Sequence, residues 1–290
     1  MNRMADLASA LLDLLHELKE TDIKLIVGGG YGIYLRYREF LKTQSRTLLK
    51  ELPEPRSTND LDLFLKSELL VDPKRVMALS QALDRLGYEA IEMARYYQFM
   101  KKGPGGGNAG SIKIDILTGP ERVFETMGLR TDPRRVRPKS SAHLHAHPVN
   151  EALTLEERLM SVRVDGRLST GEDTEGEIFL PHSFTFLMMK LFALRDCMND
   201  ATKDYGRHHA LDMYTVVALM TEEEWDSSVA MYAEHRSDPK IEEACGLIVK
   251  LFGSELDFGV LRLKENAYYR PEFQVPEFMQ AIRDLFKRQA

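Results

Sequence analysis

The strongest constraint on the fold is the stretch at positions 56–65, which reads Arg-Ser-Thr-Asn-Asp-Leu-Asp-Leu-Phe-Leu. Its second half alternates between polar and apolar residues. Strand side chains point to opposite faces of a sheet with period two, so this pattern predicts a β-strand. Asp60 and Asp62 then share one face. The leucines between them lie on the other, where they can anchor the strand in a core.

The two carboxylates would lie about 7 Å apart along such a strand. Like charges this close raise each other's pKa unless a cation lies between them. Mg²⁺ is usually held by a few carboxylates together with substrate phosphates. Asp60 and Asp62 therefore indicate a site for Mg²⁺ or Mn²⁺. The alternative is an exposed edge strand whose outer face carries two acids, because Asp-x-Asp is common by itself.

A possible phosphate-binding turn precedes this strand. Residues 23–27 read as a short buried strand, three glycines follow at 28–30, and a helical pattern runs from Tyr31 to about Leu49. A helix N-terminus after a glycine turn presents free backbone N–H groups to a phosphate. The arginine at 36 could reach the phosphate as well, although a solvated helix face is the favoured interpretation for it.

A third carboxylate lies on a later strand. Residues 111–117 alternate, with isoleucines on one face and Asp115 on the other together with Lys113. If this strand lies beside the first, Asp115 comes next to Asp60 and Asp62. Three carboxylates beside a phosphate-binding turn are typical of two-metal phosphoryl or nucleotidyl transfer.

The order of these motifs resembles the DNA polymerase β-type nucleotidyltransferase superfamily, and within it the AbiEii/AbiGii toxin family, which includes the MenT-type toxins. The likeness is carried by Gly29-Gly30, Arg56-x-Thr58-x-Asp60-x-Asp62 and the lone Asp115. Two later stretches extend it over about the first two thirds of the chain. They are Lys190 within residues 187–195, which resembles the third family motif, and Asp212 within residues 207–214, which resembles the fourth.

The resemblance implies transfer of a nucleoside monophosphate from an NTP to an acceptor hydroxyl, with Mg²⁺ or Mn²⁺ held by Asp60, Asp62 and Asp115. Lys190 is the fourth implied catalytic residue, because it would offset charge on the triphosphate. Nucleotide binding is assigned to Gly29, Gly30, Tyr31, Arg56, Thr58, Lys190 and Asp212. Tyr31 stands where the family usually has Ser or Thr. Either a glycine N–H replaces that hydroxyl, or triphosphate binding is altered.

The acceptor implied by the resemblance is the tRNA acceptor end, or another RNA or protein hydroxyl, and the family suggests a cognate antitoxin as partner. The formal net charge of −6 argues against a protein that coats nucleic acid through bulk charge. A local basic stretch is the candidate RNA surface, and a solvated loop is the alternative. It comprises Arg130, Arg134, Arg135, Arg137 and Lys139.

Two other function classes share parts of this pattern. A small-molecule nucleotidyltransferase of the antibiotic-modifying kind would use the same aspartates with a cationic acceptor. A non-catalytic NTP-binding module acting through a partner protein would need the glycine turn but not Asp115. The sequence does not choose the NTP or the acceptor.

The predicted fold class is α/β (α+β). A small mixed sheet forms a nucleotidyltransferase core at 1–150, and linker strands and a C-terminal helical bundle at 151–290 close the nucleotide cleft. Helices are expected near 4–20, 31–49 and 72–86, from Pro181 onward, near 203–220, from Trp225, and near 239–252 and 275–288.

Several features exclude other classes of protein. His143, His145 and His147 alternate, but no Cys, Asp or Glu nearby completes a zinc site. The glycine-rich residues 103–110 lack the ending of a P-loop and predict a hairpin turn. The two cysteines have no paired spacing, and no apolar run is long enough to span a membrane. A cytoplasmic location is therefore expected.

Overall fold

The structure is a computed structural model that describes residues 3–54, 56, 58–94, 96–103, 110–139 and 141–287. Most of the glycine-rich segment, residues 104–109, lies outside the described residues. The chain forms two compact units, one of Met1–Gly32 with Ser57–Pro181 and one of Ile33–Arg56 with His182–Ala290. The predicted division at residue 150 differs from this arrangement, in which the two units interleave along the chain. Within the described residues, no helix has the length and apolar character needed to cross a membrane.

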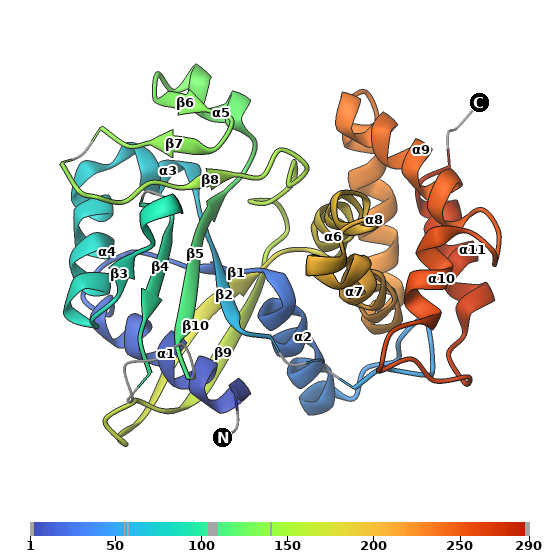
Figure 1. The fold of residues 1–290 in the computed structure, drawn as a ribbon, viewed down its shortest axis with the longest axis horizontal. Helices are drawn as coiled ribbons and strands as arrows, with labels where there is room; N and C mark the ends of the chain where they lie inside the picture. Colours follow the sequence, from blue (N-terminus) through green and yellow to red (C-terminus); the bar gives the residue numbers. More distant parts are fainter. Residues whose placement is uncertain are drawn as a thin grey trace. The chain divides into compact units, whose positions relative to one another are not determined.

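The first unit is built on an eight-stranded mixed sheet (Figure 1). Its strand order is β3-β4-β5-β2-β1-β10-β9, and β8 pairs with β5. The β2–β5 and β1–β10 pairs are parallel, whereas β1–β2, β4–β5 and β9–β10 are antiparallel. The strands are β1 Ile26–Val27, β2 Asp60–Leu65, β3 Glu89–Ala90, β4 Gln98–Lys101, β5 Ile112–Thr118, β8 His147–Pro148, β9 Met160–Arg167 and β10 Asp173–Leu180. The predicted mixed α/β sheet is confirmed. It is wider than expected, because the β9–β10 hairpin joins it through β1.

Helices cover this sheet, and a separate hairpin lies beyond β5. The additional elements of the unit are α1 Arg3–Glu17, the start of α2 Gly29–Thr43, α3 Ser67–Val71, α4 Pro73–Arg85, the short 3₁₀ helix Glu92–Ala94, α5 Glu121–Thr126, and the two-stranded β6 Arg130–Asp132 and β7 Arg135–Arg137. The expected helix near 72–86 is confirmed: the Asp72 side chain accepts hydrogen bonds from the N–H groups of Lys74 and Arg75, and proline follows at the first helical position. Helix α1 packs on β9 and β10.

Alternation in β2 and β5 places the acids as expected. Leu61, Leu63 and Ile114 are fully buried, whereas the acids between them are partly exposed. The apolar faces therefore fix which side of each strand carries the carboxylates.

The second unit is helical. It contains most of α2 and then α6 Ser183–Cys197, the 3₁₀ helix Ala201–Gly206, α7 Arg207–Leu219, α8 Glu222–His235, α9 Pro239–Phe252, α10 Phe258–Lys264 and α11 Val275–Leu285. Helix α6 is buried along most of its length and packs on α7, α8 and α9. The predicted helical C-terminal half is confirmed.

Two expected helices have different bounds. Helix α2 ends at Thr43 rather than near Leu49, because Gln44 has a left-handed backbone with φ 51°. The helix expected at 203–220 is interrupted, since Asp204 and Tyr205 also have left-handed backbones and α7 begins only at Arg207.

Candidate active site

Three of the predicted site residues meet on neighbouring strands. In the parallel β2–β5 pair, Asp60 stands opposite Lys113 and Asp62 stands opposite Asp115. The expectation that the two strands are neighbours is confirmed. We call these four residues the carboxylate square.

A lysine neutralises part of this square. The Lys113 ammonium Nζ lies 2.9 Å from Asp115 Oδ2 and 3.4 Å from Asp60 Oδ2. Burial lowers the pKa of Lys113, but the negative charges of Asp115, Asp60 and Asp62 outweigh this and leave its pKa raised. Sequence reasoning placed Lys113 on this face but did not identify it as the counter-ion.

Asp115 has spare coordinating capacity. Its Oδ1 is buried and has no hydrogen-bond partner among the described residues, while Oδ2 accepts from Lys113. Burial raises the pKa of Asp115 above its usual value, although Lys113 and a hydrogen bond from the Gln98 side chain oppose this. A buried carboxylate oxygen without a donor is the acceptor that a hard cation needs. If one oxygen is taken from each of Asp60, Asp62 and Asp115, the three oxygens do not all lie within 4.8 Å of one another.

The glycine turn packs directly on Asp62. Gly29 begins α2 with φ +60°, and a Cβ added there would lie 1.6 Å from Asp62 Oδ2. Any side chain at position 29 would therefore displace the carboxylate. The N–H of Gly28 donates to the Asp62 carbonyl oxygen at 2.8 Å. The first N–H groups of a helix have no intrahelical partner, so the turn holds donors beside a carboxylate.

Two other predicted nucleotide contacts are Tyr31 and Thr58. The Tyr31 side chain is only 1 % exposed. This favours the N–H groups of Gly29 and Gly30 over the Tyr31 hydroxyl as phosphate donors. Thr58 is partly buried two residues before β2.

The other predicted residues form a second group, within the helical unit. Arg56 donates through Nε to Asp212 Oδ1 and through Nη2 to Asp212 Oδ2, both at 2.8 Å. Lys190 Nζ lies 2.7 Å from Asp212 Oδ2, and the lysine and aspartate side chains are 7 % and 3 % exposed. We call Arg56, Lys190 and Asp212 the buried charge cluster. Burial alone would raise the pKa of Asp212, but Lys190 and Arg56 hold it far below the usual range.

Two histidines that sequence reasoning did not select lie beside this cluster. The rings of His208 and His209 are 4.0 Å apart between centroids. Burial and then the Lys190 charge lower the pKa of His209 to about 2. Its Nδ1 is buried, and no group in the part of the chain that the structure describes bonds to it. The available signal was their position one helical turn before Asp212.

The arginine at 36, expected on a solvated helix face, is instead buried. Its Nη2 donates to Glu224 at 2.7 Å and to Ser183 at 2.8 Å, and its side chain is 3 % exposed. Its contacts are therefore with helices of its own unit. The prediction of a solvated position was wrong, because the sequence alone does not reveal these distant partners.

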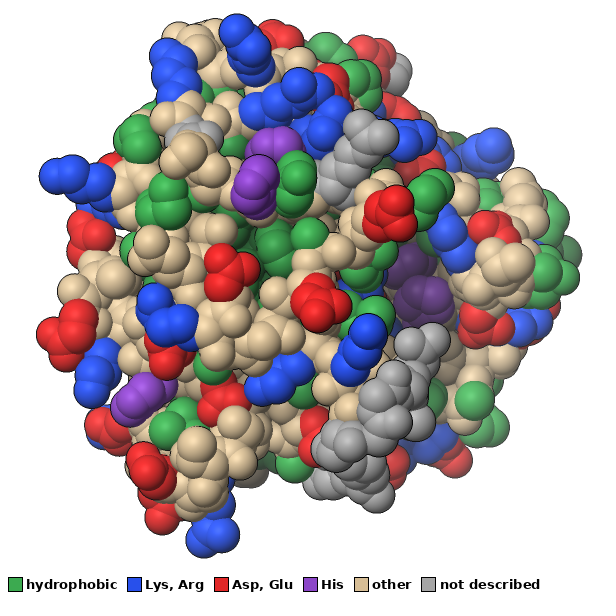
Figure 2. All heavy atoms as spheres, turned by 60° about the vertical axis from the view of Figure 1, so that its left-hand side comes forward, with side chains coloured by type: hydrophobic (Ala, Val, Ile, Leu, Met, Phe, Trp, Pro, Cys, Tyr) green, Lys and Arg blue, Asp and Glu red, His purple; other side chains and the backbone are tan. Residues whose placement is uncertain are grey.

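The basic stretch forms the β6–β7 hairpin rather than an irregular loop. Arg135 and Arg137 pair with Asp132 at 3.2 Å and 2.6 Å, whereas Arg134 is exposed. Arg130 and Lys139 are exposed as well. One face of the molecule shows Lys and Arg side chains gathered beside histidines (Figure 2).

The alternating histidines pack against tyrosines instead of assembling as metal ligands. The ring of Tyr96 stacks on His143 at 4.8 Å and meets His145 edge-on at 5.3 Å, and Tyr97 lies 5.3 Å from His147. Among the described residues, these histidines belong to no group with metal-ligand spacing. We call these five rings the aromatic platform.

The aromatic platform adjoins both the basic hairpin and the carboxylate square. His147 Nδ1 lies 2.8 Å from the carbonyl oxygen of Arg134. The Tyr97 carbonyl oxygen accepts from the N–H of Ile116 at 2.8 Å, and Gln98 pairs with Asp115. The platform therefore begins at the strand position next to Asp115.

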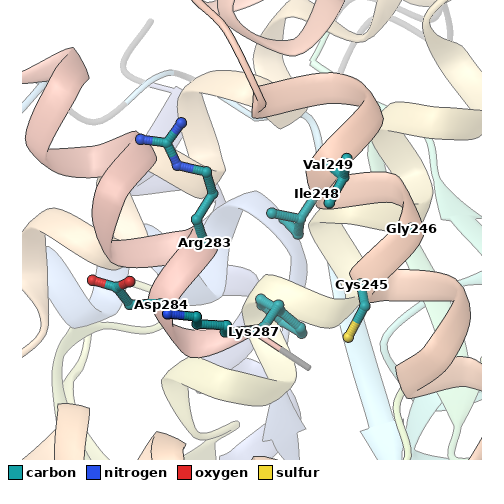
Figure 3. A pocket seen from close by; sticks show the side chains of 8 residues that line it. Cys245, Gly246, Ile248, Val249, Arg283, Asp284 and Lys287 are labelled. Carbon is teal, nitrogen blue, oxygen red and sulfur yellow. The ribbon is translucent and has the colours of Figure 1, made fainter. Parts of the chain in front are cut away.

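A separate pocket lies in the helical unit between α9 and α11 (Figure 3). Its volume is about 620 Å³, and its lining includes Cys245, Arg283 and Lys287. None of the predicted site residues lines it.

The chain was compared with protein families, curated proteins and solved structures. No family model and no curated protein matches this chain. The chain is similar to the solved structure of the antibiotic-resistance factor ANT(2'')-Ia, with 13% identity and a TM-score of 0.35 over 79% of this chain and 96% of that one. It is also similar to an antigenic nucleotidyltransferase-like protein from Paracoccidioides brasiliensis, with 13% identity and a TM-score of 0.38 over 84% and 92% of the two chains.

Proposed function

We propose that this protein is a metal-dependent nucleotidyltransferase that moves a nucleoside monophosphate from an NTP to an acceptor hydroxyl. The observation that carries the proposal is the close approach of Gly29 to the Asp62 carboxylate, since we assign the glycine turn to phosphate and the carboxylate to a metal ion. Further support is the buried oxygen of Asp115 on the neighbouring strand, which has no hydrogen-bond partner among the described residues.

In this proposal Asp60, Asp62 and Asp115 hold Mg²⁺ or Mn²⁺. When bound, the ions would supply positive charge to the triphosphate and the reacting oxygens. Asp115 is also the proposed acceptor for the proton of the attacking hydroxyl.

The N–H groups of Gly29 and Gly30 are assigned to phosphate oxygens, and Lys190 is assigned to triphosphate charge. Asp212 would hold the Lys190 ammonium in place, and Arg56 in turn would hold Asp212. Lys190→Ala should therefore weaken use of NTP while leaving acceptor binding unchanged.

For the acceptor we propose RNA, with the tRNA acceptor end as the first candidate because of the family resemblance. The support is chemical: arginines attract phosphates, and unpaired bases stack on aromatic rings. The basic hairpin and the aromatic platform supply both groups, and the Tyr97 carbonyl oxygen of the platform bonds to the N–H of Ile116, the residue after Asp115. A toxin role with a cognate antitoxin and a cytoplasmic location are proposed from the resemblance and composition alone.

The test is incubation with each α-labelled NTP, Mg²⁺ and cellular RNA, protein or small molecules in separate reactions. We expect label in RNA with the parent protein and none with Asp62→Asn. Label in small molecules would replace the proposed acceptor. Absence of label in every reaction would leave a non-catalytic NTP-binding module.

A further inference from the structure

The carboxylate square contains its own cation. Three carboxylates and one ammonium give it a formal charge of −2, from −3 and +1. The ammonium bridges Asp60 and Asp115, which come from different strands. It is therefore bound to oxygens that the proposed function assigns to the metal.

We propose that Lys113 is an internal counter-ion that competes with the divalent metal and makes metal binding depend on the nucleotide. This inference rests on the proposed function, since it takes Asp60, Asp62 and Asp115 as metal ligands. In this role Lys113 is a positioning residue.

The competition follows from the geometry. The 2.9 Å contact between Lys113 and Asp115 Oδ2 is a charge-assisted hydrogen bond, which a metal ion has to break if it takes that oxygen. A metal ion on the other oxygen, Oδ1, would lie beside the same ammonium and be repelled by it. The pair is also partly screened from water, because the Lys113 and Asp115 side chains are 31 % and 14 % exposed. Metal alone therefore gains less from these oxygens than it would from three unpaired carboxylates.

A nucleotide changes this balance. A triphosphate brings several negative oxygens, which a released ammonium can contact. The lysine stem is flexible, so Nζ can move without displacement of β5. The contact is not needed to join the strands, because β2 and β5 are paired from Asp60 to Leu65 and carry fully buried leucines and isoleucines. Lys113 is thus free to exchange partners.

The first test measures Mn²⁺ affinity from the electron paramagnetic resonance signal of free Mn²⁺. We compare the parent with Lys113→Met and with the control Lys24→Met. Lys24 lies in the same unit, and its Nζ is 3.6 Å from Glu177 with the side chain 58 % exposed. Without nucleotide, Lys113→Met should bind Mn²⁺ about tenfold more tightly than the parent, and the control should not change. Affinity equal to or below that of the parent would overturn the proposal.

Repeating the titration with a non-hydrolysable NTP analogue tests the coupling. The analogue should tighten Mn²⁺ binding more in the parent than in Lys113→Met, because only the parent ammonium needs a new partner. An equal gain in both proteins would contradict the coupling.

A third measurement uses the parent protein alone, so a folding defect in a variant cannot affect its result. An amine-acylating reagent should label Lys113 more strongly in saturating Mg²⁺ than in its absence, relative to Lys24, as read by peptide mass spectrometry. Unchanged relative labelling would show that the metal does not release the ammonium.

Asp62→Asn separates the two proposals. If that variant binds Mn²⁺ as the parent does, the proposed metal site is wrong. If it loses Mn²⁺ while Lys113→Met shows no gain, the metal site stands and only the role of Lys113 is wrong.

Discussion

The carboxylate square and the buried charge cluster both combine carboxylates with cationic side chains, but in opposite proportions. The square has three carboxylates and one ammonium and carries a formal charge of −2. The cluster has one carboxylate and two cations, for a formal charge of +1. A surplus of carboxylates invites a cation, whereas a surplus of cations presents positive charge to an anion such as a triphosphate.

The two sites also differ in how completely their aspartates are bonded. Both oxygens of Asp212 accept hydrogen bonds from Arg56, and one also meets Lys190. Asp115 has one buried oxygen to which no described residue donates. A carboxylate with both oxygens hydrogen-bonded holds its partners in place, whereas an oxygen without a donor is available to a ligand. This comparison predicts opposite consequences for the same substitution in the two places.

The largest effect should come from Asp212→Asn. It leaves Lys190 and Arg56 without a compensating carboxylate in a nearly inaccessible position, so the free energy of unfolding should fall by about 3–5 kcal/mol. Urea denaturation measures this. The matched control, Asp115→Asn, should leave stability unchanged or raise it, because burial disfavours the charged form of Asp115 and Lys113 keeps its contact with Asp60. Equal losses in both variants would remove the distinction between the two sites.

The next effect concerns transfer. Replacing Asp60, Asp62 or Asp115 singly with Ala should lower nucleotidyl transfer by more than ~100-fold, or roughly 2.7 kcal/mol of transition-state stabilisation. Initial rates of label incorporation measure it, with thermal melting as the check on folding. Near-parental transfer by Asp115→Ala would refute the three-carboxylate site.

A smaller effect should appear in the pH dependence of stability. The pKa of His209 is about 2 in the folded protein and about 6.5 when unfolded, so below pH 6.5 the unfolded chain binds more protons. Stability is full above pH 6.5 and falls as the pH drops, by about 2 kcal/mol at pH 5 from this residue. His209→Gln should lose less stability between pH 7 and pH 5 than the parent, as measured by urea denaturation in this range. Identical pH profiles would show that the cluster does not keep this histidine neutral.

The smallest effect should come from the basic hairpin. Arg134→Ala and Arg135→Ala should each weaken RNA binding regardless of sequence and lower the salt slope of log K by about 1 or slightly less. NTP binding should not change. Arg163→Ala is a matched control, since Arg163 is exposed on β9 and pairs with Glu175. Unchanged RNA affinity in the double variant would move the acceptor surface elsewhere.

Period-two alternation was enough to predict the carboxylates, because a strand buried on one face allows only one orientation. It placed Asp60 and Asp62 on one side of β2, and Asp115 with Lys113 on one side of β5. The Asp72-Pro73 start of α4 was equally local. These features depend on neighbouring residues in the chain, which the sequence shows directly.

Contacts between distant residues were not predictable in this way. Alternation fixes a face but not the register that sets Lys113 opposite Asp60. Arg56 was read together with the acids that follow it, but it bonds to Asp212, 156 residues away. The histidines after residue 140 showed a strand-like spacing, and only the fold reveals the tyrosines that they contact.

The contact between Gly29 and Asp62 also bears on how this chain can vary. Position 29 favours glycine, since every alternative carries a Cβ that would overlap the Asp62 carboxylate and force it to move. A substitution there would therefore disturb the turn and the acid together. Descendants of this protein that keep the acid in this position are expected to keep the glycine. We expect Gly29 and Asp62 to be lost together in descendants that are no longer under selection for this chemistry.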